Sequence, residues 1–183
     1  YQSVSGGGKA PMDELIEQTK LVLDGKKVKS KNFTKQIAFN AIPQIDLFSD
    51  DGYTKEELKM TNETKKILDD KIDLTATCVR IPVQISHAES LNIEFEKNVS
   101  VSEIQQALKS AEGCLVLDDP KKNKYATPID AEGKNDTFVS RIRQDNSQKN
   151  TINLWIVSDN LLRGAALNAV EIAESYYNKL NEK

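Results

Sequence analysis

The segments Phe138-Val-Ser-Arg-Ile142 and Ile152-Asn-Leu-Trp-Ile-Val157 have the apolar character of β-strands and follow each other along the chain. A third segment, Leu91 to Phe95, alternates apolar and polar residues with the period of a strand. A short strand at Cys114 to Leu117 precedes a long loop over residues 118–136. Neighbouring strands interrupted by single helices are typical of α+β domains. The sequence therefore predicts an α+β fold with a mixed, largely antiparallel sheet and helices packed on one face.

Four helices are predicted around these strands. Apolar residues from Met12 to Leu23 follow helical spacing until Gly25. The stretches Thr54-Lys-Glu-Glu57 and Ser100-Val-Ser-Glu103 are capping boxes, which mark helix N-termini. A last helix follows Asn160, and small or apolar residues give it a wide apolar surface: Ala165, Ala166, Leu167, Ala169, Val170, Ile172, Ala173 and Tyr176.

Two other apolar runs, Ile37 to Ile42 and Ile72 to Ile85, are interpreted as strands. The second is the longest β-like run in the chain and leads into the only histidine, His87. Arg80 and His87 lie an odd number of residues apart, so they would point to opposite faces of a continuous strand. For both side chains to reach one site, the strand must end or bend near Ser86, and we predict that it does.

Length, charge and cysteine usage exclude several classes of protein. The chain has 183 residues, the size of one domain, and a formal net charge of -3, which argues against a nucleic-acid binder because such proteins carry a basic face. No signal peptide is recognisable and no apolar run approaches the length of a membrane span, so we expect a cytoplasmic protein without a membrane partner. Cys78 and Cys114 form no metal-binding spacing; we predict no metal site and interpret both as small buried apolar residues.

Arg80 and His87 are the first candidates for chemistry. An arginine side chain is a planar fork that fits a carboxylate, and a histidine is the usual proton carrier near neutral pH. The pair suggests a site that clamps a small anionic substrate and moves a proton beside it. The stretch from Thr77 to His87 contains no catalytic nucleophile, and from the residues alone a structural turn role for His87 remains equally open.

Two other patterns are ambiguous from the residues alone. Glu56 and Lys59 have the spacing of an exposed helical salt bridge, which is the favoured interpretation from spacing. The glycine-rich stretch Val4-Ser-Gly-Gly-Gly-Lys9 precedes a helix and is compatible with phosphate approach or with a plain helix-entry turn.

Four segments in matching order closely resemble bacterial aspartate-semialdehyde dehydrogenases, and the likeness runs nearly end to end. They are Tyr-Gln-Ser-Val-Ser-Gly (1–6), Glu-Glu-Leu-Lys-Met-Thr-Asn-Glu-Thr-Lys (56–65), Thr-Cys-Val-Arg-Ile-Pro-Val (77–83) with Ser86-His87, and Ser-Asp-Asn-Leu-Leu-Arg-Gly-Ala-Ala-Leu-Asn (158–168).

This resemblance implies that the chain is the second of the family's two domains. Residues 1–160 would form a substrate-binding and homodimerisation domain, and residues 161–183 a helix that packs on the family's NADP-binding Rossmann-type domain. That domain and the nucleophilic cysteine would precede Tyr1, since neither Cys78 nor Cys114 matches the nucleophile. We therefore expect the isolated chain to be inactive. Without the Rossmann-type domain, apolar residues of the last helix should be exposed, exchanged with another chain or poorly ordered: Leu167, Val170 and Ile172.

The family reaction converts L-aspartate 4-semialdehyde, phosphate and NADP into L-4-aspartyl phosphate and NADPH, a step of diaminopimelate, lysine, threonine and methionine biosynthesis. The resemblance implies that His87 is the acid/base and that Gln2 orients the reacting group and contacts the substrate. The remaining implied roles are substrate carboxylate binding by Arg80, substrate ammonium binding by Glu56, phosphate binding by Lys59, and NADP contacts at Ser5, Gly6 and Asn160.

Two alternatives stay open. The isolated chain could be a catalytically inert dimerisation module, which concerns the fragment rather than its parent protein. The parent could also be a related acyl-phosphate reductase of the N-acetylglutamyl-phosphate type. Glu56 argues against that second alternative, because a blocked amino group needs no carboxylate partner.

Overall fold

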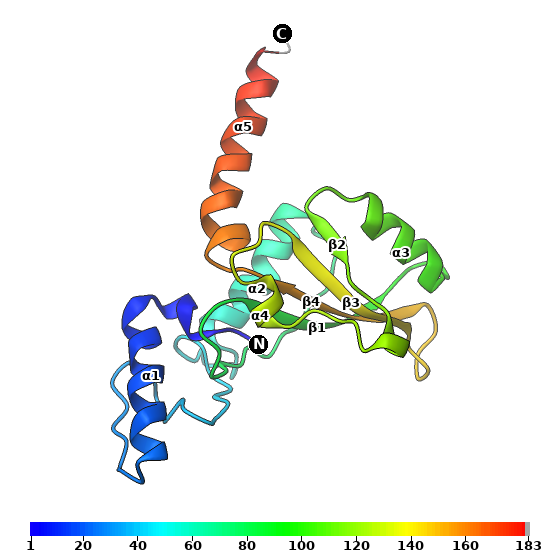
Figure 1. Ribbon diagram of the computed structural model, residues 1–183. Coiled ribbons are helices and arrows are strands. Elements are labelled where there is room, and N and C mark those ends of the chain that lie inside the picture. Colours follow the sequence, from blue (N-terminus) through cyan, green and yellow to red (C-terminus); the bar gives the residue numbers. More distant parts are fainter. Residues whose placement is uncertain (182–183) are drawn as a thin grey trace. The chain divides into compact units, whose positions relative to one another are not determined.

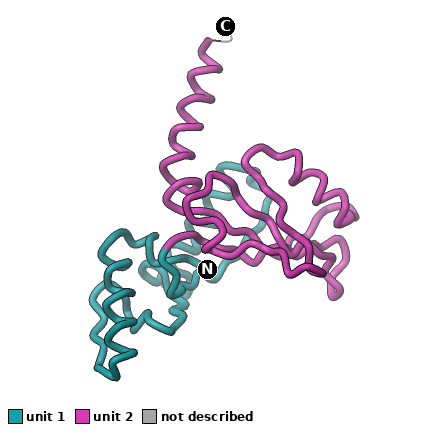
Figure 2. The backbone as a smooth tube through the Cα atoms, viewed as in Figure 1, with its two compact units in different colours: residues 1–84 teal, residues 85–183 magenta. Residues whose placement is uncertain are grey.

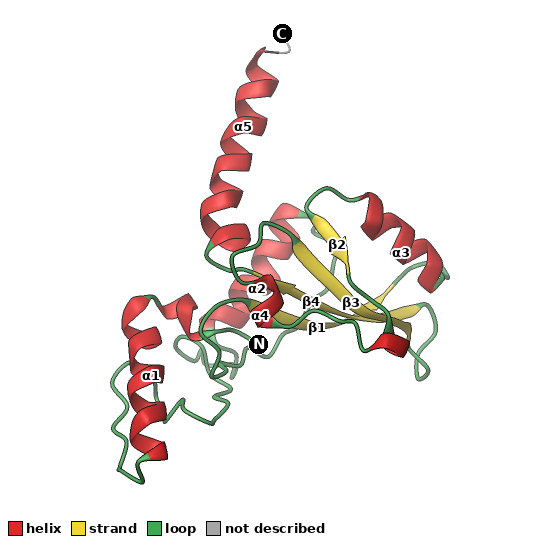
Figure 3. Ribbon diagram, viewed as in Figure 1, coloured by secondary structure: helices red, strands yellow, loops and turns green. Residues whose placement is uncertain are grey.

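The computed structural model describes residues 1–181 and divides the chain into two compact units (Figure 2). Unit 1 is Tyr1–Gln84, and unit 2 begins at Ile85. Unit 1 combines helices with long loops, whereas the strands of the described residues belong to unit 2 (Figure 3). The regular secondary structure of unit 1 is therefore helical, whereas unit 2 contains a sheet as well as helices.

The helices of unit 1 are those that the sequence predicts. A short 3-10 helix, η1 (Val4–Gly7), is followed by α1 (Lys9–Leu23), and Gly8 between them has a φ of 88°, in the left-handed region that favours glycine. Helix α2 (Lys55–Ile67) begins at Thr54, whose N–H donates to Glu57 Oε2 at 2.8 Å. Both helix predictions are confirmed, including the capping box of α2.

The two strands predicted in unit 1 are wrong. Residues 37–40 form a turn in which Phe39 has a φ of 57°. Residues 72–85 form no strand: Arg80 makes isolated bridges with Gln2 and Ile42, and the carbonyls of Val83 and Gln84 accept single backbone hydrogen bonds. Pro82 lacks an N–H, so it cannot extend a ladder. Ile37, Ala38 and Ile42 of the first run are instead buried beside α1, in a core cluster with Val4 and Leu15, whereas Phe39 is 64% exposed.

Two buried polar side chains of α1 anchor the loop that follows this helix. Glu14 accepts hydrogen bonds from the backbone N–H groups of Lys31 and Asn32 at 2.8 and 2.7 Å. Gln18 donates to Glu14 at 2.7 Å, and its oxygen accepts from the N–H of Ile37 at 2.8 Å. The loop over residues 26–36 is thus held by helix side chains rather than by secondary structure of its own.

Replacing Glu14 by alanine is expected to lower the free energy of unfolding by about 3 kcal/mol, because two backbone donors would lose their charged partner. Burial raises the pKa of Glu14, but hydrogen bonds from Lys31, Asn32 and Gln18 outweigh it and hold the pKa below its ordinary value of 4.5. The stabilisation is therefore complete above the ordinary pKa and is lost as the pH falls through the lowered one.

Urea denaturation at pH 7 and at about pH 3 measures this difference. Glu17 is the matched control on the same helix, since its carboxylate is exposed and pairs only with the exposed Lys31 ammonium at 3.3 Å. Glu17→Ala should change stability by less than about 1 kcal/mol. Equal losses in the two variants at pH 7 would contradict the anchoring role of Glu14.

Unit 2 is built on a four-stranded sheet. Its strands are β1 (His87–Glu94), β2 (Cys114–Val116), β3 (Thr137–Gln144) and β4 (Thr151–Ser158), in the order β1-β4-β3-β2. The β1–β4 and β3–β4 pairs are antiparallel, and the β2–β3 pair is parallel. The predicted mixed, largely antiparallel sheet is confirmed.

Alternating side chains divide this sheet into two faces. Helix α3 (Val101–Ser110) begins at the predicted Ser100 capping box and packs on one face through Ile104 and Leu108. The opposite face contacts the single-turn helix α4 (Pro128–Ala131), which lies within the segment predicted as a loop, as does the 3-10 turn η2 (Pro120–Lys122). The core under α3 consists of Val139, Ile142, Ile152 and Leu154, with Leu91, Ile93, Phe95, Val99, Val101, Val116 and Ile156 beside it.

The last helix of unit 2 extends away from the sheet (Figure 1). A π-helical stretch, η3 (Leu162–Ala166), leads into α5 (Leu167–Asn181). Val170 is 54% exposed and Ile172 is 61% exposed, whereas Leu167 is partly buried. The expected exposure is confirmed for Val170 and Ile172. In the described part of the chain, no helix combines the length and apolarity that a membrane span requires.

Candidate functional site

The N-terminal segment of unit 1 brings Gln2 beside Arg80. Gln2 donates its N–H to the carbonyl of Val79 at 2.8 Å and accepts from the N–H of Ile81 at 3.0 Å. The same pairing continues where Val4 donates to the carbonyl of Val83 at 2.9 Å. Residues 78 positions apart are thereby fixed next to each other through their backbones.

Arg80 carries a nearly buried positive charge. The residue is 9% exposed, and one guanidinium nitrogen, Nη1, donates to the carbonyl of Ser3 at 2.6 Å. Burial lowers the pKa of Arg80, and the charge of Glu56 acts in the opposite direction. Among residues 1–181, no acidic side chain lies within ion-pair distance of this guanidinium. A fork held at one nitrogen can offer its remaining donors to an anionic ligand.

The first turn of α2 contributes a carboxylate to the same region. Glu56 Oε1 accepts from Gln2 Nε2 at 2.9 Å, and Glu56 Oε2 lies 3.4 Å from Lys59 Nζ. The Glu56 side chain is only 20% exposed, whereas that of Lys59 is 55% exposed. The helical salt bridge expected from spacing is present, but its carboxylate is bound on the other side by a partly buried amide. Unit 1 therefore brings together Gln2, Glu56, Lys59 and Arg80.

The glycine-rich turn of unit 1 has its own backbone hydrogen bonds. The N–H of Ser5 donates to Gln84, that of Gly6 to Ser3, and that of Gly8 to Ser5, at 3.1, 3.3 and 2.9 Å. These donors are engaged within the fold, as in a helix-entry turn. Ser5 is buried, while Gly6 is exposed and leaves its backbone accessible.

Unit 2 places His87 and Asn160 at one end of its sheet. His87 is the first residue of β1 and pairs with Ser158, the last residue of β4. Ser86 donates its N–H to Asn160 Oδ1 at 3.0 Å, which fixes the amide two residues beyond the strand.

The bend predicted near Ser86 is confirmed, since this residue has a φ of 76°. Within the described residues, its Oγ is also the one buried side-chain polar atom without a hydrogen-bond partner. A left-handed backbone at a non-glycine residue and an unpaired buried hydroxyl both destabilise the folded state, and both occur at Ser86, directly before His87.

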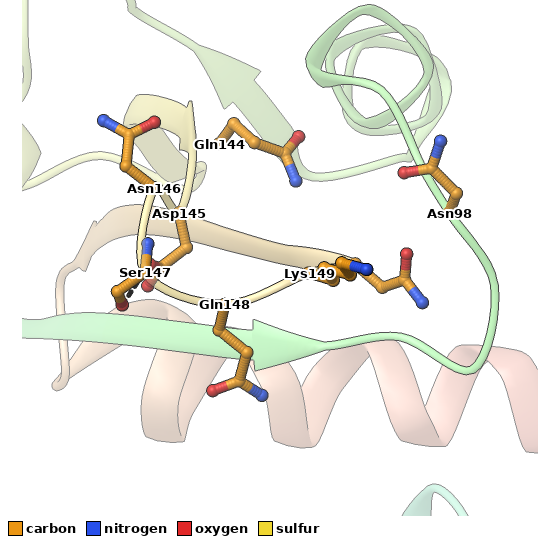
Figure 4. A pocket seen from close by; sticks show the side chains of 8 residues that line it. Asn98, Gln144, Asp145, Asn146, Ser147, Gln148 and Lys149 are labelled. Carbon is orange, nitrogen blue, oxygen red and sulfur yellow. Dashed lines mark hydrogen bonds between the residues drawn. The ribbon is translucent and has the colours of Figure 1, made fainter.

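A pocket at the β3–β4 turn lies apart from all predicted site residues of unit 2 (Figure 4). Asp145 is one of the residues that line it, and its carboxylate accepts hydrogen bonds from Ser147, Asn92 and Asn153. The bonds from Ser147, followed by that from Asn153, hold the pKa of Asp145 well below its usual range. These contacts stabilise a turn. Among residues 1–181, no group of three or more His, Cys, Asp or Glu side chains is placed to hold a metal ion.

A family model described as the dimerisation domain of semialdehyde dehydrogenases matches residues 1–163. The chain belongs to the semialdehyde dehydrogenase family. The match includes both groups of candidate residues, those around Arg80 and those around His87. Its last matched residue, at position 163, lies within η3, so the whole of α5 falls outside the match.

Individual members of the family are similar over almost the whole chain. The aspartate-semialdehyde dehydrogenase of Aquifex aeolicus is 50% identical over 176 residues, which are 95% of this chain and 52% of that protein. Among solved structures, this chain is similar to the crystal structure of aspartate-semialdehyde dehydrogenase II from Vibrio cholerae complexed with ASA, with a TM-score of 0.91 and 46% sequence identity. The superposition covers 95% of this chain and 52% of the Vibrio cholerae chain. The aspartate-semialdehyde dehydrogenase of Candida albicans with NADP gives a TM-score of 0.63 at 26% identity over 76% of this chain and 44% of that one.

The chain thus spans about half the length of the semialdehyde dehydrogenases that it matches. Cys78 is buried, as expected, whereas Cys114 is only partly buried.

Two residues of the unit 1 site were missed by sequence reasoning. The Ser3 carbonyl anchors Arg80, and a backbone acceptor leaves no signal in the sequence. Glu57 was recognised only as part of a capping box, although its carboxylate also accepts from the N–H of Cys78 at 2.8 Å.

Proposed function

We propose that this chain is the substrate-binding and dimerisation half of an NADP-dependent aspartate-semialdehyde dehydrogenase. The complete enzyme would convert L-aspartate 4-semialdehyde, phosphate and NADP into L-4-aspartyl phosphate and NADPH. One observation carries the proposal: unit 1 presents a nearly buried guanidinium that has no ion pair among residues 1–181, together with the Glu56 carboxylate, whose side chain is 20% exposed. These two charges complement the carboxylate and ammonium groups of an amino-acid substrate.

The contacts of unit 1 support a division of labour among its side chains. Arg80 would bind the α-carboxylate through the nitrogens that Ser3 does not occupy, and Glu56 would bind the ammonium. The Gln2 side-chain amide donates to Glu56, and the same amide would contact the reacting carbonyl of the substrate. Lys59 is more exposed and would hold the incoming phosphate. A blocked amino group would leave Glu56 without a partner, which disfavours the N-acetylated substrate of related reductases.

His87 would act as the general acid and base. It would take the proton of the nucleophilic thiol, which we do not assign to Cys78 or Cys114, and later exchange a proton with the oxygen of the substrate adduct. The Ser86–Asn160 hydrogen bond supports this role, since it fixes the backbone directly before the imidazole.

NADP, when bound, would accept the hydride. Gly6 in unit 1 leaves its backbone accessible beside the buried Ser5, and Asn160 in unit 2 accepts from the N–H of Ser86; each of them would contribute one cofactor contact. Most cofactor contacts would come from a Rossmann-type domain, and α5 would pack on it through Val170 and Ile172. Residues 161–183 would then belong structurally to that domain. We place the enzyme in the cytoplasm, in lysine, threonine and methionine biosynthesis.

A second role concerns the chain on its own as a homodimerisation module. The family description names a dimerisation domain. In unit 2, the sheet face opposite α3 carries the exposed Ser90 and Asn92 and the partly exposed Trp155, whose indole N–H donates to Ala126 at 3.0 Å. A broad face with a fixed aromatic residue suits a contact between two copies.

The complete gene product is expected to reduce NADP when given L-aspartate 4-semialdehyde and phosphate, whereas the 183-residue chain alone should show no turnover. Absorbance at 340 nm follows the reaction. Turnover by the 183-residue chain alone would contradict the proposal that it is half of an enzyme. A complete gene product without turnover would contradict the assigned activity. Analytical ultracentrifugation of the chain tests its second role, which a monomer at micromolar concentration would contradict.

A further inference from the structure

Glu57 is a buried carboxylate that the proposed reaction does not use. It is the third residue of α2, directly after Glu56, and only 6% exposed. Its Oε2 accepts from the N–H of Thr54 at 2.8 Å, which closes the capping box. Its Oε1 accepts from the N–H of Cys78, also at 2.8 Å. The two oxygens therefore bind two different segments of unit 1.

A second capping box in the same chain shows what capping alone requires. At the start of α3, Glu103 Oε2 accepts from the N–H and hydroxyl of Ser100 at 2.7 Å, and the Glu103 N–H donates back to Ser100 Oγ at 3.2 Å. Glu103 is exposed, and its side-chain bonds stay within its own helix turn. Burial of the Glu57 charge and its bond to Cys78 are additional to the cap, and a buried charge is unfavourable unless it is well hydrogen-bonded.

The Cys78 bond connects the two charged groups of the candidate substrate site. Glu57 adjoins Glu56 on α2, and Cys78 lies two residues before Arg80. One turn further along the helix, Thr61 Oγ1 lies 3.3 Å from the carbonyls of Glu57 and Leu74 and shares its proton between them, so α2 contacts the same extended segment again. The position of Glu56 relative to the Arg80 backbone is therefore set by side chains of α2.

Glu56 and Arg80 attract each other but do not form an ion pair. The charge of Glu56 acts on Arg80, yet the described residues include no contact within 4.0 Å between the two side chains. Arg80 is held by Ser3, and Glu56 is held by Gln2. Opposite charges at low exposure would close on each other unless their supports kept them apart. The structure thus keeps a guanidinium and a carboxylate separated.

We infer that Glu57 is a positioning residue that holds Glu56 and Arg80 at the spacing required by an α-amino acid, whose ammonium and carboxylate share one carbon. The inference rests on the proposed function and deepens it: Glu57 sets the preference for substrates that carry the amino group. Without the Cys78 tie, α2 shifts relative to residues 78–80, and the two charges no longer fit both groups together. Misplacement by about 1 Å is enough to cost roughly 10²-fold in rate.

The test compares two aldehydes in the complete gene product. Succinate semialdehyde has the carbon chain and carboxylate of L-aspartate 4-semialdehyde but no amino group. The measured quantity is the ratio of kcat/KM for the two substrates. We expect Glu57→Ala to lower this ratio by roughly 10- to 100-fold, mainly through a higher KM for the amino acid. Glu103→Ala removes a capping box without a second tie, so the ratio should stay at the wild-type value.

Thermal midpoints of both variants show how much each cap contributes, and all rates are measured well below them. If Glu57→Ala lowers the midpoint but leaves the ratio unchanged, Glu57 is a cap only and the inference is overturned. Should Glu57→Ala fail to fold, Thr61→Val removes the second tie without removing a charge, and it should lower the ratio in the same direction. A wild-type protein that turns over neither aldehyde contradicts the proposed function instead, so the two failures are distinguishable.

Discussion

Replacing His87 by glutamine should lower kcat of the complete gene product by about 10²–10⁴-fold, the usual contribution of a general acid or base. His87 is the only histidine of these 183 residues, so no other imidazole of this chain can take over its role. Glutamine keeps a polar side chain of similar size but cannot exchange a proton near neutral pH. KM for L-aspartate 4-semialdehyde should change little, because the proposed contacts to its charged groups lie on unit 1.

The pH profile separates proton transfer from a structural role. In the wild type, kcat should change with pH, because a general acid or base works only in the correct protonation state, and this dependence should be lost in His87→Gln. Circular dichroism of both proteins provides the folding control. A variant that retains the wild-type rate and pH profile would show that His87 is the structural turn residue that the sequence alone leaves open.

Replacing Arg80 by lysine is expected to have the second largest effect, a rise in KM for L-aspartate 4-semialdehyde of about 30-fold or more. Weakening a buried, hydrogen-bonded charge contact costs about 2 kcal/mol or more, which corresponds to that factor. Lysine retains the charge and can still donate to the Ser3 carbonyl, but it has no second nitrogen in the plane of a carboxylate.

Steady-state kinetics at saturating phosphate and NADP measure the Arg80 effect. The two variants serve as controls for each other, because Arg80→Lys should act on KM and His87→Gln on kcat. An unchanged KM in Arg80→Lys would show that the guanidinium supports the fold through Ser3 and does not bind substrate.

Local sequence signals predicted the parts of the fold that local interactions determine. Thr54 and Ser100 begin helices where the capping boxes place them, and the alternation around Leu91 marks a strand. The runs at residues 37–42 and 72–85 misled for one reason. Both are irregular segments that bury some apolar residues, such as Ile37, Ile42 and Cys78, and apolar content alone does not distinguish such a segment from a strand.

The candidate site shows the same limit. Arg80 and His87 were recognisable by residue type, and Glu56 by resemblance. The anchoring of Arg80 on a carbonyl 77 positions away, and the bond from Cys78 to Glu57, depend on how distant backbones meet. A capping box is recognisable from four consecutive residues of the sequence. The additional hydrogen bond of the Glu57 carboxylate to the Cys78 N–H is not, because Cys78 is distant in the sequence.

The anchoring of residues 26–36 has a practical consequence for engineering. Glu14 and Gln18 hold this loop at Lys31, Asn32 and Ile37, while the side chains at positions 26, 27 and 29 point into solvent without contributing to the core. Peptide tags or fluorophore attachment sites introduced between residues 26 and 29 would lie next to an anchored part of the loop and would not replace any residue that Glu14 or Gln18 binds. The loop is therefore a suitable place to attach a reporter to this protein without disturbing its chemistry.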